Sequence, residues 1–185
     1  MILYRCFAWD RGADPPARGG ALWFPRLLQG EGRHDAPERY GCLYVSESAV
    51  SAVAEQLAPL AGARLDGPDL VRGGLPLALA ALRLREEARV VDLDEPLVLA
   101  EEALRPSLVA TRERARSQAH AALLHERHPD AAGLRWWSAL EPLWANVTLF
   151  DRASPELAVE ELWPLELGSD VVGEAAAFLG LAVAA

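Results

Sequence analysis

The 185-residue chain contains no lysine: all 18 of its basic residues are arginine, set against 27 Asp and Glu residues. The net charge of −9 argues against sequence-independent binding to nucleic acid, because such binding needs many cationic contacts to phosphate. A local arginine cluster that holds one small anion remains compatible with this composition, since a guanidinium can bond two phosphate oxygens at once. The lack of lysine is equally compatible with a GC-rich coding bias.

Cysteine is also scarce. Cys6 and Cys42 lie far apart and form neither a CxxC pair nor a zinc-binding spacing. We expect both to be small buried hydrophobic residues in strands, although a single disulfide between them stays open. His125 and His128 share one face of a predicted helix, but without an HExxH pattern or further ligands they do not predict a metal site.

Several functional motifs are missing. The chain has no GxGxxG or GxxxxGK[ST] phosphate loop and no GxSxG nucleophile motif. Its first residues, MILYRCFAW, lack the basic leader and cleavage site of a signal peptide, and its apolar C-terminal run is too short to span a bilayer. The sequence therefore predicts a soluble, cytoplasmic protein with no membrane partner.

The periodicity of apolar residues predicts a mixture of strands and helices. The predicted strands are 2–9, 42–46, 88–95, 133–138, 145–151 and 156–167. The predicted helices are one capped by Ser46 or Ser48, one over 96–103, a long one over 109–127 and one that begins near an Asp170 cap. Residues 75–86 remain ambiguous between helix and strand. This irregular order predicts the α+β class and a single domain over residues 1–185.

Taken singly, the polar residues of these elements have ordinary alternatives. Glu55 falls about 140° from Val50 on the helical wheel, so it faces either water or a cleft. Arg5, in the middle of the first strand, points to solvent or, if turned inward, needs an anionic partner. Ser138 alone is typical of a turn. Of Trp136 and Trp137, which point to opposite faces, one is expected in the core and the other could line a cleft.

Three segments taken in order resemble the RES-domain family, which is named for its Arg, Glu and Ser. They are LYRCF near the start, GRHDAPERYGCLYVSESAVSAVAE in the middle and GLRWWSALEPLWANVTLFD near the end. They match a strand with an early arginine, a G-R…G-x-x-Y-[LV]-[AS] block that leads into a helix with a late glutamate, and a G-L-x-x-x-S…N-x-x-L-F-D block.

The resemblance implies a compact mixed β core flanked by helices, similar to ADP-ribosyltransferases. It implies NAD⁺ as a substrate, with no cofactor, and cleavage of the nicotinamide–ribose bond either by phosphorolysis, with phosphate as co-substrate, or by hydrolysis. It further implies the toxin of a toxin–antitoxin pair, with a helix-turn-helix antitoxin as partner and no direct contact with nucleic acid. An ADP-ribosyltransferase that modifies a protein target is the alternative.

The resemblance also implies the site residues. The implied catalytic residues are Glu55, Arg33, Tyr44 and Ser138, and the implied substrate-binding residues are Arg5 and Asn146, with no metal. Glu55 would stabilise an oxocarbenium-like ribose, and the two arginines would hold the pyrophosphate or an attacking phosphate. Tyr44 would pack on the nicotinamide or the ribose. Ser138 would donate or accept a hydrogen bond rather than act as a nucleophile.

One stretch departs from the family pattern. Many members have Gly-Gly-Arg-Trp-Asn where this chain has Glu31-Gly32-Arg33-His34-Asp35. The aromatic residue and the amide that follow the arginine are both replaced. This departure favours a further alternative, a non-catalytic RES-like module that binds without cleaving.

Overall fold

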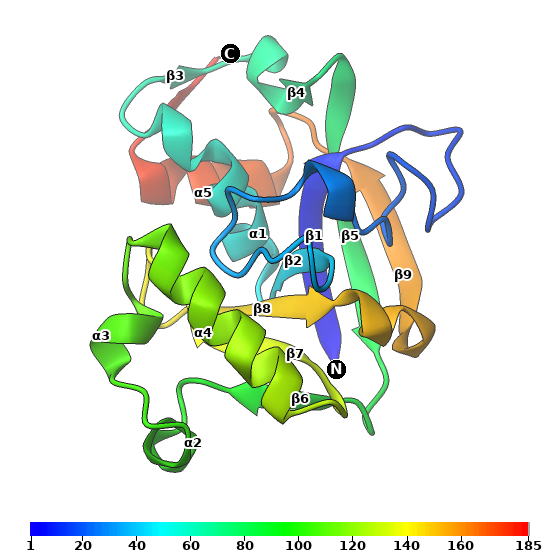
Figure 1. The fold of residues 1–185 in the computed structure, drawn as a ribbon. Helices are drawn as coiled ribbons and strands as arrows, with labels where there is room; N and C mark the ends of the chain where they lie inside the picture. Colours follow the sequence, from blue (N-terminus) through cyan, green and yellow to red (C-terminus); the bar gives the residue numbers. More distant parts are fainter. Residues whose placement is uncertain (185) are drawn as a thin grey trace. The chain divides into compact units, whose positions relative to one another are not determined.

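The computed structural model describes residues 1–184 (Figure 1). By their internal contacts these residues form two compact units, each made of several separate segments of the chain. The first unit comprises Met1–Trp23, Val45–Arg83 and the segment that begins at Ala158. The second comprises Phe24–Tyr44 and Leu84–Leu157. Strands and helices alternate irregularly in both, and most strand pairs are antiparallel, so the predicted α+β class is confirmed.

The first unit is built on the long strand pair β1–β5. Its elements are β1 (Ile2–Ala8), the end of β2 (Cys42–Ser46), α1 (Ala49–Leu57), η2 (Ala58–Leu60), β3 (Arg64–Leu65), η3 (Gly67–Leu70), β4 (Val71–Arg72), β5 (Leu75–Leu84), β9 (Leu157–Pro164), α5 (Asp170–Leu179) and β10 (Ala182–Val183). Strand β5 pairs with β1, β4 and β9, as Figure 1 shows for β1 and β9. Strand β1 pairs on its other side with β2, where Tyr4 lies opposite Ser46.

Helices α1 and α5 of this unit contact each other. Helix α1 buries Val53, Ala54 and Leu57, which are three of the four residues predicted for its apolar face. Its N-cap is Ser48, one of the two predicted serines, whose side chain accepts a hydrogen bond from the Ser51 N–H. The cap predicted at Asp170 is wrong, because Ser169 holds the N-cap position of α5 and Asp170 is the first helical residue.

The second unit holds the remaining strands and helices. Its elements are η1 (Arg26–Leu28), β6 (Arg89–Asp92), α2 (Pro96–Glu101), α3 (Pro106–Val109), α4 (Arg114–Arg127), β7 (Ala131–Trp137), β8 (Ala145–Phe150) and η4 (Asp151–Glu156). Strand β7 pairs antiparallel with β8 and parallel with β6. Helix α4 packs on β7 and lies in front of it in Figure 1. The buried side chains between them include Leu124, Leu134, Trp136 and Phe150.

The structure corrects one predicted helix and assigns the one stretch that was ambiguous between helix and strand. The helix predicted over 109–127 begins five residues later than predicted, because α3 ends at Val109 and α4 runs from Arg114 to Arg127. The ambiguous stretch 75–86 is a strand, β5, most of which is buried on both faces. The two cysteines are buried, as predicted, and both are free thiols.

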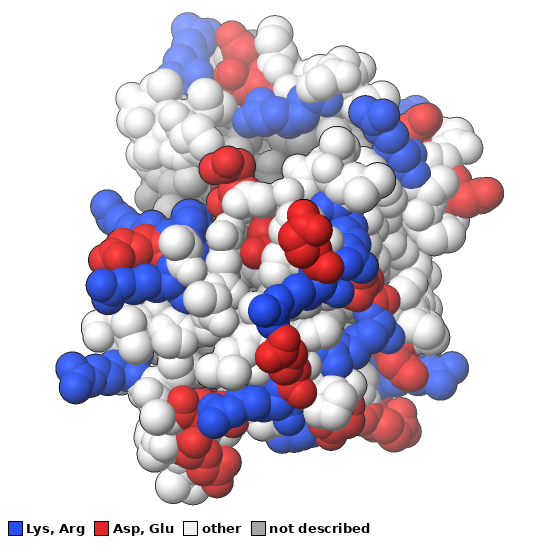
Figure 2. Space-filling model, in the orientation of Figure 1, with Lys and Arg blue, Asp and Glu red and all other residues white. Residues whose placement is uncertain are grey.

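The charged residues are mixed on the surface. On the face drawn in Figure 2, arginines and acidic residues alternate over short distances. The TRERAR segment is largely solvated, as predicted, with Arg112 through Arg116 exposed. Over residues 1–184, no helix is both long enough and apolar enough to cross a membrane.

Candidate active site

The six predicted site residues are divided between the two units. Arg5 and Glu55 belong to the first unit, and Arg33, Tyr44, Ser138 and Asn146 belong to the second. Most of the buried polar side chains also belong to the second unit: Arg33, His34, Asp35, Ser117, Ser138, Asn146 and Thr148. Because buried polar groups are costly unless they are hydrogen-bonded, such a concentration is the most informative feature of this unit.

Arg5 is turned inward from β1, yet it donates its hydrogen bonds to backbone carbonyls rather than to an anionic side chain. Its Nη1 donates to the backbone carbonyls of Gly20 and Ala21, at 3.1 and 2.6 Å. Its guanidinium lies 4.7 Å from the ring centroid of Phe7, which is two residues along the strand and therefore on the same face. Burial lowers the pKa of Arg5 to about 9, so the side chain stays charged at neutral pH. It ties the 10–22 loop to β1.

Glu55 lies off the apolar face of α1, as predicted. Its neighbours Val53 and Ala54 are fully buried, whereas Glu55 itself is partly exposed. The helix is held by its packing against β1 and α5, so the position of this carboxylate is fixed by a rigid element rather than by a loop.

Arg33 is 7% exposed and is held at both its backbone and its side chain. Its Nη1 donates to the carbonyls of Val109 and Thr111, at 3.0 and 2.7 Å. Its guanidinium lies 4.8 Å from the ring centroid of Trp136, and its own carbonyl accepts a 2.6 Å bond from the Ser117 hydroxyl. Arg33 thus joins its loop to the α3–α4 connection and to β7.

Asp35 closes the loop that carries Arg33. Its Oδ2 accepts hydrogen bonds from the backbone N–H groups of Gly30 and Gly32, at 2.8 and 2.7 Å. Its Oδ1 accepts a 2.7 Å bond from the Tyr44 hydroxyl. That hydroxyl in turn accepts a 2.9 Å bond from the His34 N–H. A Cβ on Gly32 would lie 2.5 Å from the Tyr44 hydroxyl oxygen, so only glycine fits there without displacement.

Burial and the neighbouring acidic groups, Cys42 and Asp35, raise the pKa of Tyr44 well above its ordinary value. The phenol is therefore protonated at neutral pH and is no general base. Its ring is partly exposed and packs against the buried cluster of the second unit. What Tyr44 can offer a ligand is its ring.

His34 anchors the same loop to β8. Its Nδ1 lies 2.8 Å from Oγ1 of Thr148, which also accepts a 3.0 Å bond from Nε1 of Trp136. The His34 ring meets the Trp136 ring edge to face, with 5.3 Å between centroids. Burial, with the nearby charges of Arg33 and Arg114, lowers the pKa of His34 to about 3, so the imidazole is neutral.

Ser138 and Asn146 come from the β7–β8 pair. Ser138 follows β7 and is 1% exposed, and its N–H donates to the Trp144 carbonyl at 2.7 Å. Its hydroxyl accepts a 3.0 Å bond from the Leu140 N–H, which shapes the turn before β8. Asn146 is 4% exposed and lies directly opposite Trp136 in the strand register. Trp136 therefore links three of the predicted residues of this unit, because it stacks on Arg33, faces Asn146 across the ladder and precedes Ser138 by two residues.

A cavity of about 420 Å³ opens in the first unit, lined mainly by apolar groups that include Tyr4, Leu79, Trp163 and Leu165. None of the six predicted site residues is among its lining residues.

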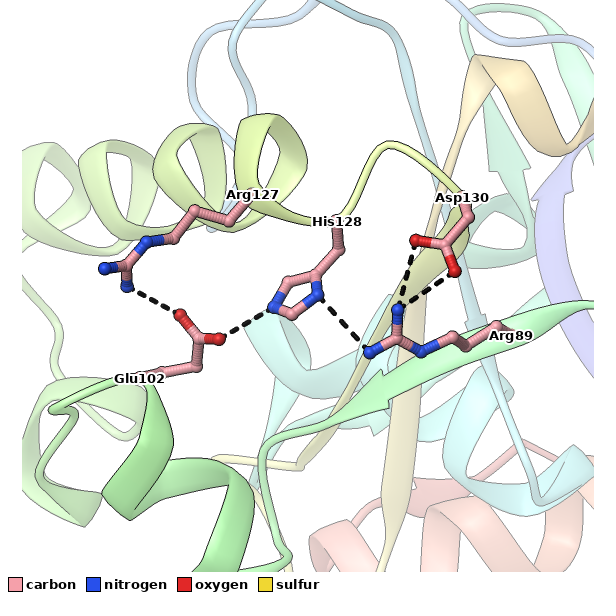
Figure 3. A network of polar contacts seen from close by, with 5 residues as sticks. All are labelled: Arg89, Glu102, Arg127, His128 and Asp130. Carbon is pink, nitrogen blue, oxygen red and sulfur yellow. Dashed lines mark hydrogen bonds and ion pairs between the residues drawn. The ribbon is translucent and has the colours of Figure 1, made fainter.

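The histidines near the end of α4 serve packing and hydrogen bonding. His125 stacks on Tyr40 with ring centroids 4.3 Å apart. His128 Nε2 lies 2.8 Å from a carboxylate oxygen of Glu102, and its Nδ1 lies 3.3 Å from Arg89 Nη2 (Figure 3). Because an arginine N–H can only donate, Nδ1 accepts and the proton sits on Nε2. Within residues 1–184, no three or more His, Cys, Asp or Glu side chains are grouped so that they could hold a metal ion.

Several residues that shape the site were not assigned a role from the sequence. The sequence identifies His34 and Asp35 only as departures from the family pattern, and it gives no signal for Thr148, Ser117 or Gln118. Gln118 donates from Nε2 to the carbonyls of Gly30 and Gly32, both at 2.8 Å. One signal was available for Asp35, since an aspartate just after a glycine-rich turn commonly accepts from the backbone N–H groups of that turn.

Comparisons with known proteins bear on the chain as a whole. The family model described as "RES domain" matches residues 2–167, which include all six predicted site residues. A search of curated proteins gives no match. Among solved structures, a chain of the MbcT–MbcA toxin–antitoxin complex of M. tuberculosis is similar with a TM-score of 0.57 and 16% sequence identity. The match covers 97% of this chain and 87% of that one.

Proposed function

Because the chain belongs to the RES-domain family, we propose that it cleaves the nicotinamide–ribose bond of NAD⁺ and is the toxin of a toxin–antitoxin pair. The observation that carries the proposal is the family match, which spans residues 2–167 and so includes Arg5, Arg33, Tyr44, Glu55 and Ser138. The similar fold of a chain from a toxin–antitoxin complex supports the second half of the proposal.

The proposed reaction needs little general acid catalysis. When the C1′–N bond breaks, its electron pair stays on the nitrogen, so nicotinamide leaves as a neutral base and the ribose becomes oxocarbenium-like. The carboxylate of Glu55 stabilises that positive charge. Phosphate then bonds to C1′ in phosphorolysis, giving ADP-ribose 1-phosphate, or water bonds to C1′ in hydrolysis, giving ADP-ribose and a proton.

The other residues bind and orient in this proposal. Arg5 and Arg33 place positive charge for the pyrophosphate or the attacking phosphate, Tyr44 offers its ring to the nicotinamide or ribose, and Ser138 and Asn146 supply buried polar groups. The partner is a helix-turn-helix antitoxin, and the site of action is the cytoplasm, where NAD⁺ is available.

The first experiment is incubation of purified protein with NAD⁺, with and without inorganic phosphate, followed by measurement of nicotinamide. We expect release, and faster release with phosphate indicates phosphorolysis. Removal of the carboxylate in Glu55→Ala should lower kcat by about 100- to 1,000-fold, the cost typical of losing one preorganised electrostatic group. Glu174→Ala, which removes an exposed carboxylate from α5, is the matched control and should keep full activity.

Folded wild-type protein that releases no nicotinamide under either condition contradicts the enzyme proposal. If labelled NAD⁺ instead marks a protein band in a cell extract while bulk NAD⁺ barely falls, the protein is a transferase.

One observation favours a second candidate, a module that binds without cleaving. Arg33 donates to two backbone carbonyls, and the Tyr44 hydroxyl is bonded to Asp35 and His34, so both side chains have roles in holding the loop. Calorimetric binding of NAD⁺ without nicotinamide release would establish this candidate over the first.

A further inference from the structure

The loop from Gly30 to Asp35 is fastened by one carboxylate whose two oxygens have different partners. Oδ2 of Asp35 accepts from two backbone N–H groups, those of Gly30 and Gly32. Oδ1 accepts a hydrogen bond from the Tyr44 hydroxyl. Asp35 is 5% exposed, so these are bonds to a buried carboxylate, which are shorter and stronger than bonds between neutral groups.

This arrangement fixes the direction of the Tyr44 hydroxyl. An ionised carboxylate can only accept, so the phenol proton points at Asp35. The His34 N–H, 2.9 Å away, can only donate, so it occupies a lone pair of the same oxygen. The hydroxyl consequently has no proton to give to a ligand, and the orientation of its ring is set from one end by two bonds.

The same loop sets the position of Arg33. Arg33 lies between Gly32, whose N–H donates to Asp35, and His34, whose N–H donates to the Tyr44 hydroxyl. Its own carbonyl accepts a hydrogen bond from Ser117. Gly32 leaves no room for adjustment, because even a Cβ there would lie 2.5 Å from Oδ1 of Asp35 and from the Tyr44 oxygen. A shift of the Asp35 carboxylate would therefore move the backbone of Arg33 and the ring of Tyr44 together.

We propose that Asp35 is a positioning residue for the proposed reaction, acting through the Tyr44 hydroxyl to hold the Tyr44 ring and Arg33 in one arrangement. This inference rests on the proposed function, because its readout is NAD⁺ cleavage. It assigns the hydroxyl of Tyr44 to the loop rather than to the substrate, and it gives the departure of this chain at His34-Asp35 a structural purpose.

The two roles of Asp35, closing the loop through Oδ2 and accepting the Tyr44 hydroxyl through Oδ1, can be tested separately. In Asp35→Asn the amide oxygen still accepts from Gly30 and Gly32, but the amide nitrogen that replaces Oδ1 can only donate. The hydrogen bond that the Tyr44 hydroxyl donates is then lost, because its oxygen, which already accepts the His34 N–H, faces a second donor instead of an acceptor. The loop closure is kept. Tyr44→Phe removes the same bond from its other end. Asp94→Asn is the control, since it makes the same charge change at a side chain that is 57% exposed.

We measure kcat and KM for NAD⁺ cleavage, and the unfolding midpoint, for wild type, Asp35→Asn, Tyr44→Phe and the double variant. We expect each single variant to lose activity by similar factors, approaching about 100-fold, the loss that a misplacement of about 1 Å can produce. The double variant should be no worse than either single one, because both remove one bond. Asp94→Asn should match wild type.

Losses that multiply in the double variant overturn the proposal, as does an Asp35→Asn enzyme with wild-type kcat/KM. The proposal is also overturned if the single variants lower the unfolding midpoint non-additively in the double variant but leave kcat and KM unchanged, because the role of Asp35 is then structural alone. A wild-type protein that releases no nicotinamide overturns the proposed function and the positioning role with it, which distinguishes that failure from failure of the positioning role alone.

Discussion

Three consecutive polar residues, Arg33, His34 and Asp35, are all more than nine-tenths buried, and each is bonded by groups distant in the chain. The burial of these residues cannot be predicted from sequence periodicity, because a loop has no regular period and a polar loop ordinarily lies in solvent. The family resemblance identified Arg33 but not the reason for its neighbours. That reason is visible only when Tyr44, Thr148 and the α3–α4 connection are brought around the loop.

His34 should make the protein sensitive to acid. Its pKa is about 3 in the folded protein, mainly through burial, against about 6.5 for an exposed histidine. Between these values the unfolded state binds the extra proton, so lowering the pH from 6.5 toward 3 removes about 1.4 kcal/mol of stability per pH unit. Urea unfolding at several pH values should show a shallower slope for His34→Gln than for wild type.

The matched control is His120→Gln, at a partly exposed position on α4. It should keep the wild-type slope. Equal slopes for all three proteins would mean that His34 is not held neutral by its surroundings.

Gly133 is a second residue whose identity is fixed by contacts. A Cβ there would run into the Thr148 carbonyl oxygen and lie 3.0 Å from the Leu149 Cα, both of which are backbone atoms of the paired strand β8. Gly133→Ala should lower the free energy of unfolding by about 1–3 kcal/mol, as overpacking does. In the control Gly168→Ala the new methyl meets nothing within 4 Å, so its unfolding midpoint should not fall. A Gly133→Ala midpoint equal to wild type would show that β7 and β8 can separate at no cost.

At the scale of whole elements, the sequence predicted most strands and helices because their apolar spacing is regular. The clearest error was the start of the long helix, which was predicted at residue 109 and lies at Arg114. Residues 110–113 contain no proline or glycine to signal a break, yet the helix is interrupted there. The carbonyls of Val109 and Thr111 accept from the Arg33 side chain. A tertiary contact has overridden local propensity, which a single sequence does not reveal.

The interior of α5 offers a stabilising change. Gly173 lies within this helix, and a Cβ there would meet nothing within 4 Å. Because glycine is less favourable than alanine in a helix interior, Gly173→Ala should raise the free energy of unfolding by about 1 kcal/mol. The midpoint of urea denaturation should rise while the slope stays constant. A lower midpoint would show that the glycine relieves a packing constraint.

At the scale of the molecule, the irregular order of strands and helices predicted the α+β class correctly. The two compact units could not be predicted in this way, because they are defined by tertiary contacts and not by sequence blocks. The chain passes from one unit to the other at residues 23–24, 44–45, 83–84 and 157–158. The predicted site residues are distributed in the same way, with Arg5 and Glu55 in one unit and the other four in the second. Neither unit is therefore a single contiguous segment of the chain, and the predicted site residues are spread from Arg5 to Asn146.

This interleaving leads us to propose that the chain unfolds as one domain. Neither unit can order all of its segments without fixing the ends of segments that belong to the other, so a state with one unit folded gains little chain entropy. Urea unfolding followed by tryptophan fluorescence and by far-UV circular dichroism should give coincident transitions, as expected for a two-state domain. Gly133→Ala in one unit and Gly173→Ala in the other should shift that single transition in opposite directions. Two separated transitions, each moved by only one of these variants, would establish two independently stable domains instead.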